Sequence, residues 1–429
     1  MDHFQYRDGV LHAEAVPLPT IAAEIGTPFY CYATATMARH YEVLSGALDG
    51  SGAMICYAIK ANSNQAVIRT MVEMGAGADV ISGGELQRAL AAGAPPGRIV
   101  FAGPGKTRDE LVMALGVGIH QFNVESEPEL RMLSQVAASL GKVAPVALRV
   151  NPDVDAGTHE KITTGRKQNK FGIPIERAAG IYALGGGLPG LEMLGIALHI
   201  GSQLTELQPF EEAFSRALDL IEELRAAGHE VRRFNLGGGL GIPYGAETPP
   251  PPADYARMVK RLTDNRRLDL ILEPGRVLVG NAGILVARVI HEKHEGRRFI
   301  VIDAAMNDLL RPSLYDSWHD IVPVSQPAAD AALSPADVVG PICESGDFLA
   351  KAREMPPLAP EDLIAVRSAG AYGAVMASTY NSRPLVPEVL VRGEDFAVVR
   401  PRQEIAELLG RDRLPPWLPP PATPRAVEG

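Results

Sequence analysis

A lysine, a histidine and a carboxylate each adjoin a short apolar segment that is typical of a buried β-strand. Lys60 lies in YAIKAN, His199 in HIGSQ and Glu273 in EPGR. A lysine held in an apolar environment has the lowered pKa that it needs to form a Schiff base with an aldehyde. We therefore expect imine chemistry at Lys60. The competing interpretations are a lysine whose charge extends into water and a histidine packed in the core.

Three glycines and an arginine add the elements of an anion site. Residues 237–239 follow an apolar segment in LGGGLGI, and Arg276 follows Glu273. Consecutive glycines can point several backbone N–H groups at one anion, although a glycine run also suits a flexible turn. With Lys60, these groups are the parts that hold pyridoxal phosphate. Glu273 would keep the pyridine nitrogen protonated, which favours reactions that pass through a stabilised carbanion.

The second apolar segment ends with two further carboxylates. Asp79 lies within ADVI, and Glu85 follows in SGGEL. Glutamate three positions after a serine is typical of a helix cap, so we expect Glu85 to cap a helix rather than to act in catalysis.

Apolar segments alternate with helical ones along the first two thirds of the chain. Eight strands are predicted at 53–59, 78–81, 98–101, 120–124, 146–150, 195–200, 232–236 and 268–272. In residues 209–228, apolar side chains step by three and four onto one helix face. Eight such units predict an α/β fold with a (β/α)₈ barrel, whose active residues follow the strands. An open doubly wound sheet uses the same units and is the alternative.

Beyond residue 280 the pattern changes to strands without long helices. Strands are predicted in ILVARVI, RRFIVID, DVVGPIC, DLIAVRS, EVLVRG and DFAVVR. The strand-like segment 27–33 precedes the barrel and is expected to join this mostly β domain. The predicted organisation is an N-terminal segment 1–35, a barrel 36–280, a C-terminal β domain 281–414 and a Pro-rich tail 415–429.

Composition excludes several classes of protein. The 429 residues carry a formal charge of −10, which disfavours nucleic acid and anionic membranes as partners. Three cysteines cannot form a disulfide framework in so long a chain, and an odd number suits a reducing compartment. The N-terminus lacks the pattern of a secretory signal, and no apolar run is long enough to span a membrane. We expect a soluble, cytoplasmic protein, and no metal site is predicted.

Seven motifs in order give the chain a family resemblance. They are YAIKAN, HIGSQ, GGGLGI, EPGR, DAAMNDLLRPSLYDSWH, VVGPICESGDFLA and AGAYG. From about residue 20 to residue 395 the chain resembles the diaminopimelate decarboxylases, fold-type III pyridoxal-phosphate enzymes related to alanine racemase and ornithine decarboxylase. The resemblance implies a barrel with a C-terminal β domain. It also implies decarboxylation of meso-2,6-diaminopimelate to L-lysine and CO₂, the last step of lysine biosynthesis.

The resemblance also assigns site residues. Implied contacts to the cofactor are Lys60, Asp79, His199, Ser202, Gly237, Gly238, Gly239, Glu273, Gly275, Arg276 and Tyr372. Implied contacts to the substrate are Arg276, Arg311, Tyr315, Glu344 and Tyr372. Lys60 and His199 are the implied catalytic groups together with Cys343, the implied proton donor. The segment around Cys343 reaches the neighbouring subunit's site in this family, which implies a homodimer with shared active sites.

The implied substrate explains two of these residues. Diaminopimelate has an amino-acid group at each end, so selecting the reacting end requires a firm grip on the other. Arg311 would clamp the distal carboxylate and Glu344 would receive the distal ammonium. Ala305 stands where the family pattern has glycine, a small change. Residues 153–171 resemble the family's loop over the active site, and we expect a lid there.

Three alternatives remain. A decarboxylase of another basic amino acid or of a carboxylated polyamine would leave Arg311 facing no carboxylate. A racemase is disfavoured because the related racemases have arginine in place of Glu273. A catalytically silent homologue is disfavoured because Lys60, His199, Glu273 and Cys343 are all present.

Overall fold

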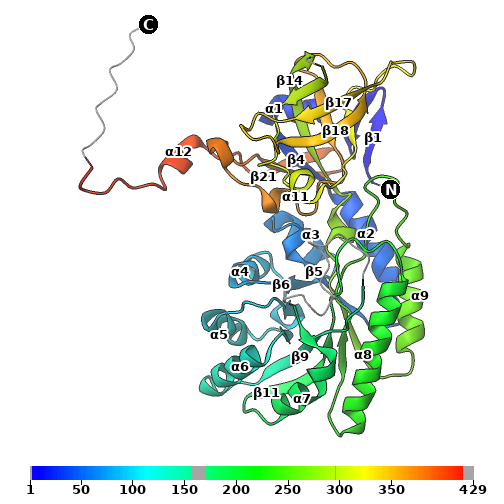
Figure 1. The fold of residues 1–429 in the computed structure, drawn as a ribbon, viewed down its shortest axis with the longest axis vertical. Helices are drawn as coiled ribbons and strands as arrows, with labels where there is room; N and C mark the ends of the chain where they lie inside the picture. Colours follow the sequence, from blue (N-terminus) through cyan, green and yellow to red (C-terminus); the bar gives the residue numbers. More distant parts are fainter. Residues whose placement is uncertain (1, 156–170, 295, 419–429) are drawn as a thin grey trace.

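The computed structural model describes residues 2–155, 171–294 and 296–418, which form a barrel and a β-rich domain stacked on it (Figure 1). The barrel strands are β5 (Met54–Ala58), β6 (Gly77–Val80), β7 (Ile99–Phe101), β8 (Gln121–Val124), β9 (Ala144–Asn151), β11 (Leu191–Ala197), β12 (Arg233–Asn235) and β13 (Asp269–Leu272). Each pairs in parallel with the next, and β13 pairs with β5 to close the barrel. The predicted (β/α)₈ barrel is confirmed, and the open sheet is excluded.

Helices surround the barrel and alternate with its strands (Figure 1). They are α2 (Thr34–Ala47), α3 (Gln65–Glu73), α4 (Gly83–Ala91), α5 (Arg108–Val117), α6 (Glu127–Ser139), α7 (Ile175–Gly186), α8 (Gln208–Ala226) and α9 (Pro252–Thr263). Shorter pieces are η1 (Ile59–Ala61), η2 (Pro96–Arg98), β10 (Ile173–Pro174) and α10 (Arg276–Val279). Side chains of Ser82, Thr107 and Ser126 cap α4, α5 and α6, which fixes where each helix begins after its strand.

The second domain is built on a long mixed sheet. Its strands are β4 (Phe29–Ala33), β14 (Gly283–His294), β15 (Arg298–Ile302), β16 (Ile321–Pro323), β17 (Ser334–Val339), β18 (Phe348–Met355), β19 (Leu363–Val366), β20 (Glu388–Arg392) and β21 (Asp395–Arg400). Strand β4, which lies in segment 27–33, pairs with β14 on one side and with β20 on the other. The domain boundaries themselves stay a proposal.

Several elements were not predicted from the sequence. They include β16, β18 and a three-stranded N-terminal sheet of β1 (Phe4–Arg7), β2 (Val10–Ala13) and β3 (Val16–Pro17). Short helices α1 (Leu18–Ile25) and α11 (Arg311–Tyr315), and the turns η4 (Ala374–Met376) and η5 (Tyr380–Ser382), connect the strands.

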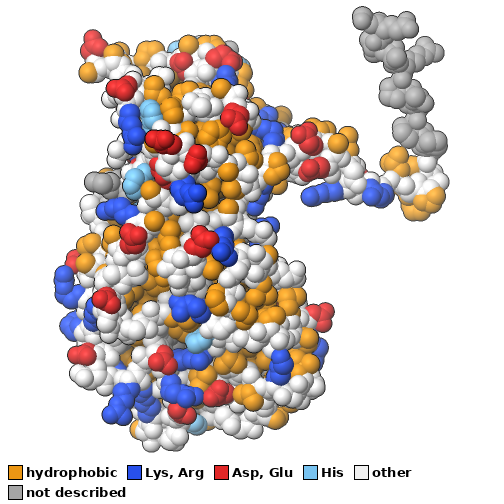
Figure 2. All heavy atoms as spheres, turned by 180° about the vertical axis from the view of Figure 1, so that it is seen from behind, with side chains coloured by type: hydrophobic (Ala, Val, Ile, Leu, Met, Phe, Trp, Pro, Cys, Tyr) orange, Lys and Arg blue, Asp and Glu red, His pale blue; other side chains and the backbone are white. Residues whose placement is uncertain are grey.

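The end of the described chain forms an arm that leaves the body. It begins at α12 (Ile405–Leu409) and carries exposed apolar side chains, seen in orange on the projection in Figure 2. Trp417 is 81% exposed. Of the predicted Pro-rich tail, only residues 415–418 lie within the described part of the chain. No helix among the described residues is both long and apolar enough to cross a membrane.

Phe214 joins the helical layer to the barrel. Its ring, buried on α8, meets Phe234 of β12 and Tyr255 of α9 edge-on, with ring centroids 5.9 and 6.3 Å away. We predict that Phe214→Ala lowers the free energy of unfolding by about 3–5 kcal/mol, because the surrounding rings cannot fill the cavity. Asp219→Ala, on the exposed face of the same helix, is the matched control and should change it little. Equal effects of both substitutions in chemical denaturation would contradict this packing.

Candidate active site

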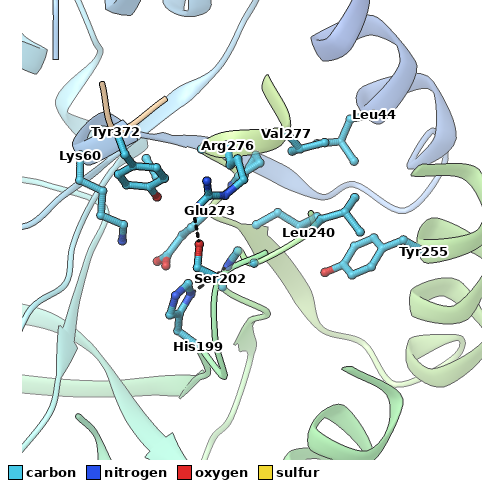
Figure 3. Close-up of a pocket in the computed structure, with 17 residues that line it drawn as sticks. Leu44, Lys60, His199, Ser202, Leu240, Tyr255, Glu273, Arg276, Val277 and Tyr372 are labelled. Atoms are coloured by element: carbon cyan, nitrogen blue, oxygen red, sulfur yellow. Dashed lines mark hydrogen bonds between the residues drawn. The ribbon is translucent and has the colours of Figure 1, made fainter. Parts of the chain in front are cut away.

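A pocket with about 510 Å³ of empty space opens where the barrel strands end (Figure 3). Ten of the predicted site residues line it: Lys60, His199, Ser202, Gly237, Gly238, Gly239, Glu273, Gly275, Arg276 and Tyr372. In Figure 3, Lys60 and Tyr372 lie at one end of the pocket and the apolar side chains of Leu44 and Tyr255 at the other. Most of these residues follow barrel strands, as expected for this fold.

Lys60 and Asp79 form an ion pair in the pocket. Lys60 lies in η1 directly after β5, and its Nζ donates to Asp79 Oδ2 at 3.2 Å from the adjacent strand β6. Burial by itself lowers the pKa of Lys60, but Asp79, Tyr372 and Glu273 together raise it above its usual value. The sequence-based expectation of a lowered pKa was therefore wrong, because a buried carboxylate stands where an apolar wall was assumed.

Glu273 is a buried carboxylate held by two amides. Its Oε1 accepts hydrogen bonds from Asn123 Nδ2 at 2.9 Å and from Asn235 Nδ2 at 2.6 Å. Burial, with the nearby Asp79 carboxylate, raises the pKa of Glu273 to about 7. Among the described residues it has no ion-pair partner, so a cationic N–H group in the pocket would compensate its charge.

His199 and the three glycines pack tightly behind the pocket. The backbone N–H of Gly238 donates to His199 Nδ1 at 3.3 Å, and that of Gly237 donates to Asn235 Oδ1 at 2.9 Å. Burial lowers the pKa of His199, so its ring is neutral with Nδ1 as an acceptor. A Cβ on Gly238 would lie 2.2 Å from the Glu273 carbonyl oxygen. The close approach of the two backbones thus requires glycine at position 238. The backbone N–H groups of Gly237 and Gly238 already donate hydrogen bonds within the protein.

Arg276 lies in the centre of the pocket. Its Nη2 donates to Ser202 Oγ at 2.9 Å and its Nη1 donates to Tyr244 Oη at 2.5 Å. Its Nε is buried and has no partner within the described ranges. Tyr372 places its ring 4.7 Å from the guanidinium carbon, and its backbone N–H bonds to the carbonyl of Ala61 next to Lys60. Gly275 packs against the η1 turn as well.

Arg311 lies beside this pocket. It begins α11 in the β domain, is 5% exposed, and places its guanidinium carbon 4.5 Å from the centre of the Tyr244 ring. Its Nη1 bonds to His319 Nε2 at 2.8 Å. Tyr315, at the other end of the same helix, lies close enough to influence the pKa of Arg311 and of Arg276. Two guanidinium groups thus lie close to the ring of Tyr244.

Cys343 and Glu344 are not brought to the pocket of their own chain. Both are exposed on the loop between β17 and β18, where the Cys343 N–H donates to Asn381 Oδ1 at 2.8 Å. Cys31 and Cys56, in contrast, are buried. The expected lid, 153–171, lies largely outside the described residues. Glu85 caps the turn before α4 by accepting from the Ile81 N–H, which confirms its structural role.

Sequence reasoning missed Tyr244, His319, Asn123 and Asn235. The asparagines are polar residues inside apolar barrel strands, in HQFNV and RRFNL, and that mismatch was the available signal. Tyr244 comes two residues after GGGLGI and His319 ends DAAMNDLLRPSLYDSWH, but neither has a spacing that predicts its contacts. No group of three or more His, Cys, Asp or Glu side chains in the described ranges is arranged to hold a metal ion.

Comparisons with known proteins agree with the geometry. Residues 34–280 match the family described as "Pyridoxal-dependent decarboxylase, pyridoxal binding domain". The chain is 51% identical over 417 residues to a diaminopimelate decarboxylase of Pseudomonas aeruginosa, covering 97% of this chain and 100% of that protein. The corresponding enzyme of Vibrio cholerae is 50% identical, with 95% and 98% covered. The structure of Helicobacter pylori diaminopimelate decarboxylase complexed with L-lysine superposes with a TM-score of 0.89 at 40% identity, with 92% and 98% covered.

We predict that Asp79→Asn lowers the pKa of Lys60. Without the carboxylate, burial disfavours the ammonium form, so the amine loses its proton at lower pH. In protein prepared without cofactor, the pH at half-maximal acylation of Lys60, followed by mass spectrometry, should fall by about one pH unit or more. Asp49→Asn, an exposed carboxylate, is the control. An unchanged or higher midpoint in Asp79→Asn would show that Asp79 does not determine the protonation of Lys60.

Proposed function

We propose a function from one premise: the chain belongs to the pyridoxal-dependent decarboxylases and, among them, to the diaminopimelate decarboxylases. It is a carboxy-lyase that converts meso-2,6-diaminopimelate to L-lysine and CO₂, the last step of lysine biosynthesis. In the reaction one carboxylate leaves as CO₂ and a proton takes its place on the same carbon.

The pocket fits pyridoxal phosphate. Among the described residues, the buried Arg276 Nε has no hydrogen-bond partner and the buried Glu273 carboxylate has no ion-pair partner. The first suits the phosphate and the second suits the protonated pyridine nitrogen. Lys60 would attach the cofactor through its Nζ, with Ser202 and the glycines 237–239 around the phosphate. When bound, pyridoxal phosphate supplies an electron-accepting ring that stabilises the electron pair left after CO₂ departs.

The protein's own groups prepare this chemistry. Asp79 holds the Nζ of Lys60 by an ion pair, which fixes the position of the amine. The neutral ring of His199, oriented by the Gly238 N–H, offers a flat uncharged surface beside the cofactor site. Glu273 would hold the proton on the cofactor's pyridine nitrogen, because its buried carboxylate has no ion-pair partner among the described residues and is stabilised by a neighbouring cation.

The buried position of Arg311 is the observation that supports diaminopimelate as the substrate. Its guanidinium is buried beside the pocket, and among the described residues it has no carboxylate partner. A buried cation without an anion is costly unless a ligand supplies the anion. The distal carboxylate of diaminopimelate meets this need, whereas ornithine and cadaverine-type amines have no carboxylate at that end. We propose Tyr315 and Tyr372 as further substrate contacts.

We also propose a homodimer with shared sites. Cys343 and Glu344 are exposed and lie outside the pocket of their own chain, although the family resemblance gives Cys343 the role of proton donor and Glu344 that of ammonium partner. Cys343 and Glu344 can fill these two roles only when their loop enters the pocket of a second chain. A cytoplasmic location is proposed on the three free cysteines, one of them exposed, which suit a reducing compartment.

The substrate assignment predicts selective CO₂ release. Purified, cofactor-loaded protein should release CO₂ from meso-diaminopimelate with formation of L-lysine, and not from L-ornithine, L-arginine or L-lysine, because only diaminopimelate has both a reacting and a distal carboxylate. Arg311→Met, which keeps an unbranched side chain but removes the guanidinium group, should lower kcat/KM by about a hundredfold or more. Efficient turnover of L-ornithine would agree with the proposed cofactor but would contradict diaminopimelate as the substrate.

Shared sites predict complementation between inactive variants. Lys60→Ala and Cys343→Ala proteins, each inactive alone, should recover about a quarter of the wild-type sites when mixed under conditions of subunit exchange, because half of the dimers are mixed and each has one intact site. Mass spectrometry of tagged subunits verifies the exchange. If mixed dimers form and no activity returns, each chain builds its own site.

A further inference from the structure

His319 contacts Arg311 through a hydrogen bond. The His319 side chain is completely buried, and its Nε2 lies 2.8 Å from Arg311 Nη1. Its Nδ1 lies 2.8 Å from the carbonyl oxygen of Arg367, which can only accept. Nδ1 therefore carries the proton, and the lone pair of Nε2 accepts from Arg311. The histidine links the arginine to the backbone of the β domain.

The charge state of His319 is fixed by its surroundings. Burial, followed by the positive charge of Arg311, lowers the pKa of His319 to about 3. The ring is consequently neutral at any pH at which the protein works. It can orient the guanidinium without neutralising it, which an aspartate or glutamate at the same place would do.

Tyr244 completes the support on a second side. Its hydroxyl accepts from Arg276 Nη1, while its ring lies under the Arg311 guanidinium and meets the His319 ring edge-on at 5.2 Å. Arg311 is thus held by an aromatic face and a neutral acceptor. None of the described residues accepts a hydrogen bond from Nε or Nη2 of Arg311, so these N–H groups are available to bind a carboxylate.

We propose that His319 is a positioning residue that presents Arg311 to the distal carboxylate of the substrate and thereby sets the preference for ligands that carry this carboxylate. The inference rests on the proposed function, because it requires Arg311 to bind the substrate. His319 touches neither the reacting atoms nor the cofactor pocket. Its loss should therefore weaken recognition of the carboxylate and leave the chemistry at Lys60 intact.

Two substitutions separate the two hydrogen bonds of His319. In His319→Gln the side-chain amide reaches the place of Nε2 and can still accept from Arg311. In His319→Asn the shorter amide replaces Nδ1, keeps a donor to the Arg367 carbonyl and leaves Arg311 without its acceptor. His294→Asn, at an exposed position of β14, is the control for loss of a histidine elsewhere.

The test compares L-lysine with cadaverine, which is the same molecule without the carboxylate, as ligands of the holoenzyme. Inhibition constants of both are measured in the decarboxylation of meso-diaminopimelate. We expect His319→Asn to raise the constant for L-lysine about tenfold, with that for cadaverine within about twofold of wild type. The KM for diaminopimelate should rise likewise with kcat little changed. His319→Gln and His294→Asn should stay within about threefold of wild type.

A double variant tests whether the effect passes through Arg311. Arg311→Lys removes the forked guanidinium group, so adding His319→Asn to this variant should weaken the binding of L-lysine no further. Three results would show that His319 is merely structural and would overturn the proposal. They are additive losses of L-lysine affinity in the double variant, an equal loss of affinity for L-lysine and cadaverine in His319→Asn, and loss of cofactor absorbance in His319→Asn. If wild-type protein releases CO₂ from diaminopimelate but does not distinguish L-lysine from cadaverine, the role of Arg311 fails. If it releases none, the proposed function fails instead.

Discussion

Closure of the barrel between β13 and β5 is the constraint on which the site depends. Ile271 pairs with Met54 and Leu272 with Ile55, and the contact continues as the Ala58 N–H donates to the Pro274 carbonyl. This pairing brings the turn that carries Lys60 beside the loop that carries Glu273, although more than 200 residues separate them in the sequence. Small residues permit the approach, since a Cβ on Gly275 would already lie 3.0 Å from the Cβ of Ala61. The amine and the carboxylate can only face one pocket if the barrel is closed.

The pocket retains charges that the protein does not neutralise. Arg276 and Arg311 are buried with hydroxyl, imidazole and aromatic partners, whereas Glu273 is held by amides. Partners of this kind orient a charged group without cancelling its charge. Folding must then bear part of the desolvation cost of these ions, which is recovered when a ligand of opposite charge binds. An anionic phosphate, a cationic ring nitrogen and a distal carboxylate are the charges that such a pocket selects.

The sequence predicted those parts of the molecule in which local pattern and tertiary environment agree. Most of the eight barrel strands are largely apolar runs, and the polar residues after them, such as Lys60 and Glu273, marked the candidate site. Strand β18 was missed because its sequence FLAKAREM consists of good helix formers, and only pairing with β17 makes it a strand. Likewise the protonation of Lys60 was misjudged because it depends on Asp79, which comes from a neighbouring strand. Contacts between distant segments leave no periodic signal in the sequence.

The two domains contribute different parts of the site. The groups that we propose for the chemistry, Lys60, His199 and Glu273, follow barrel strands, whereas Arg311 and its support His319 belong to the β domain. The domains are joined next to the reactive lysine, because the Asn62 amide donates to the Gly370 carbonyl and the Tyr372 N–H to that of Ala61. A change in the β domain can therefore alter which ligand is held without moving the amine. With the proposed roles, the barrel would retain the cofactor chemistry while the second domain would select the substrate.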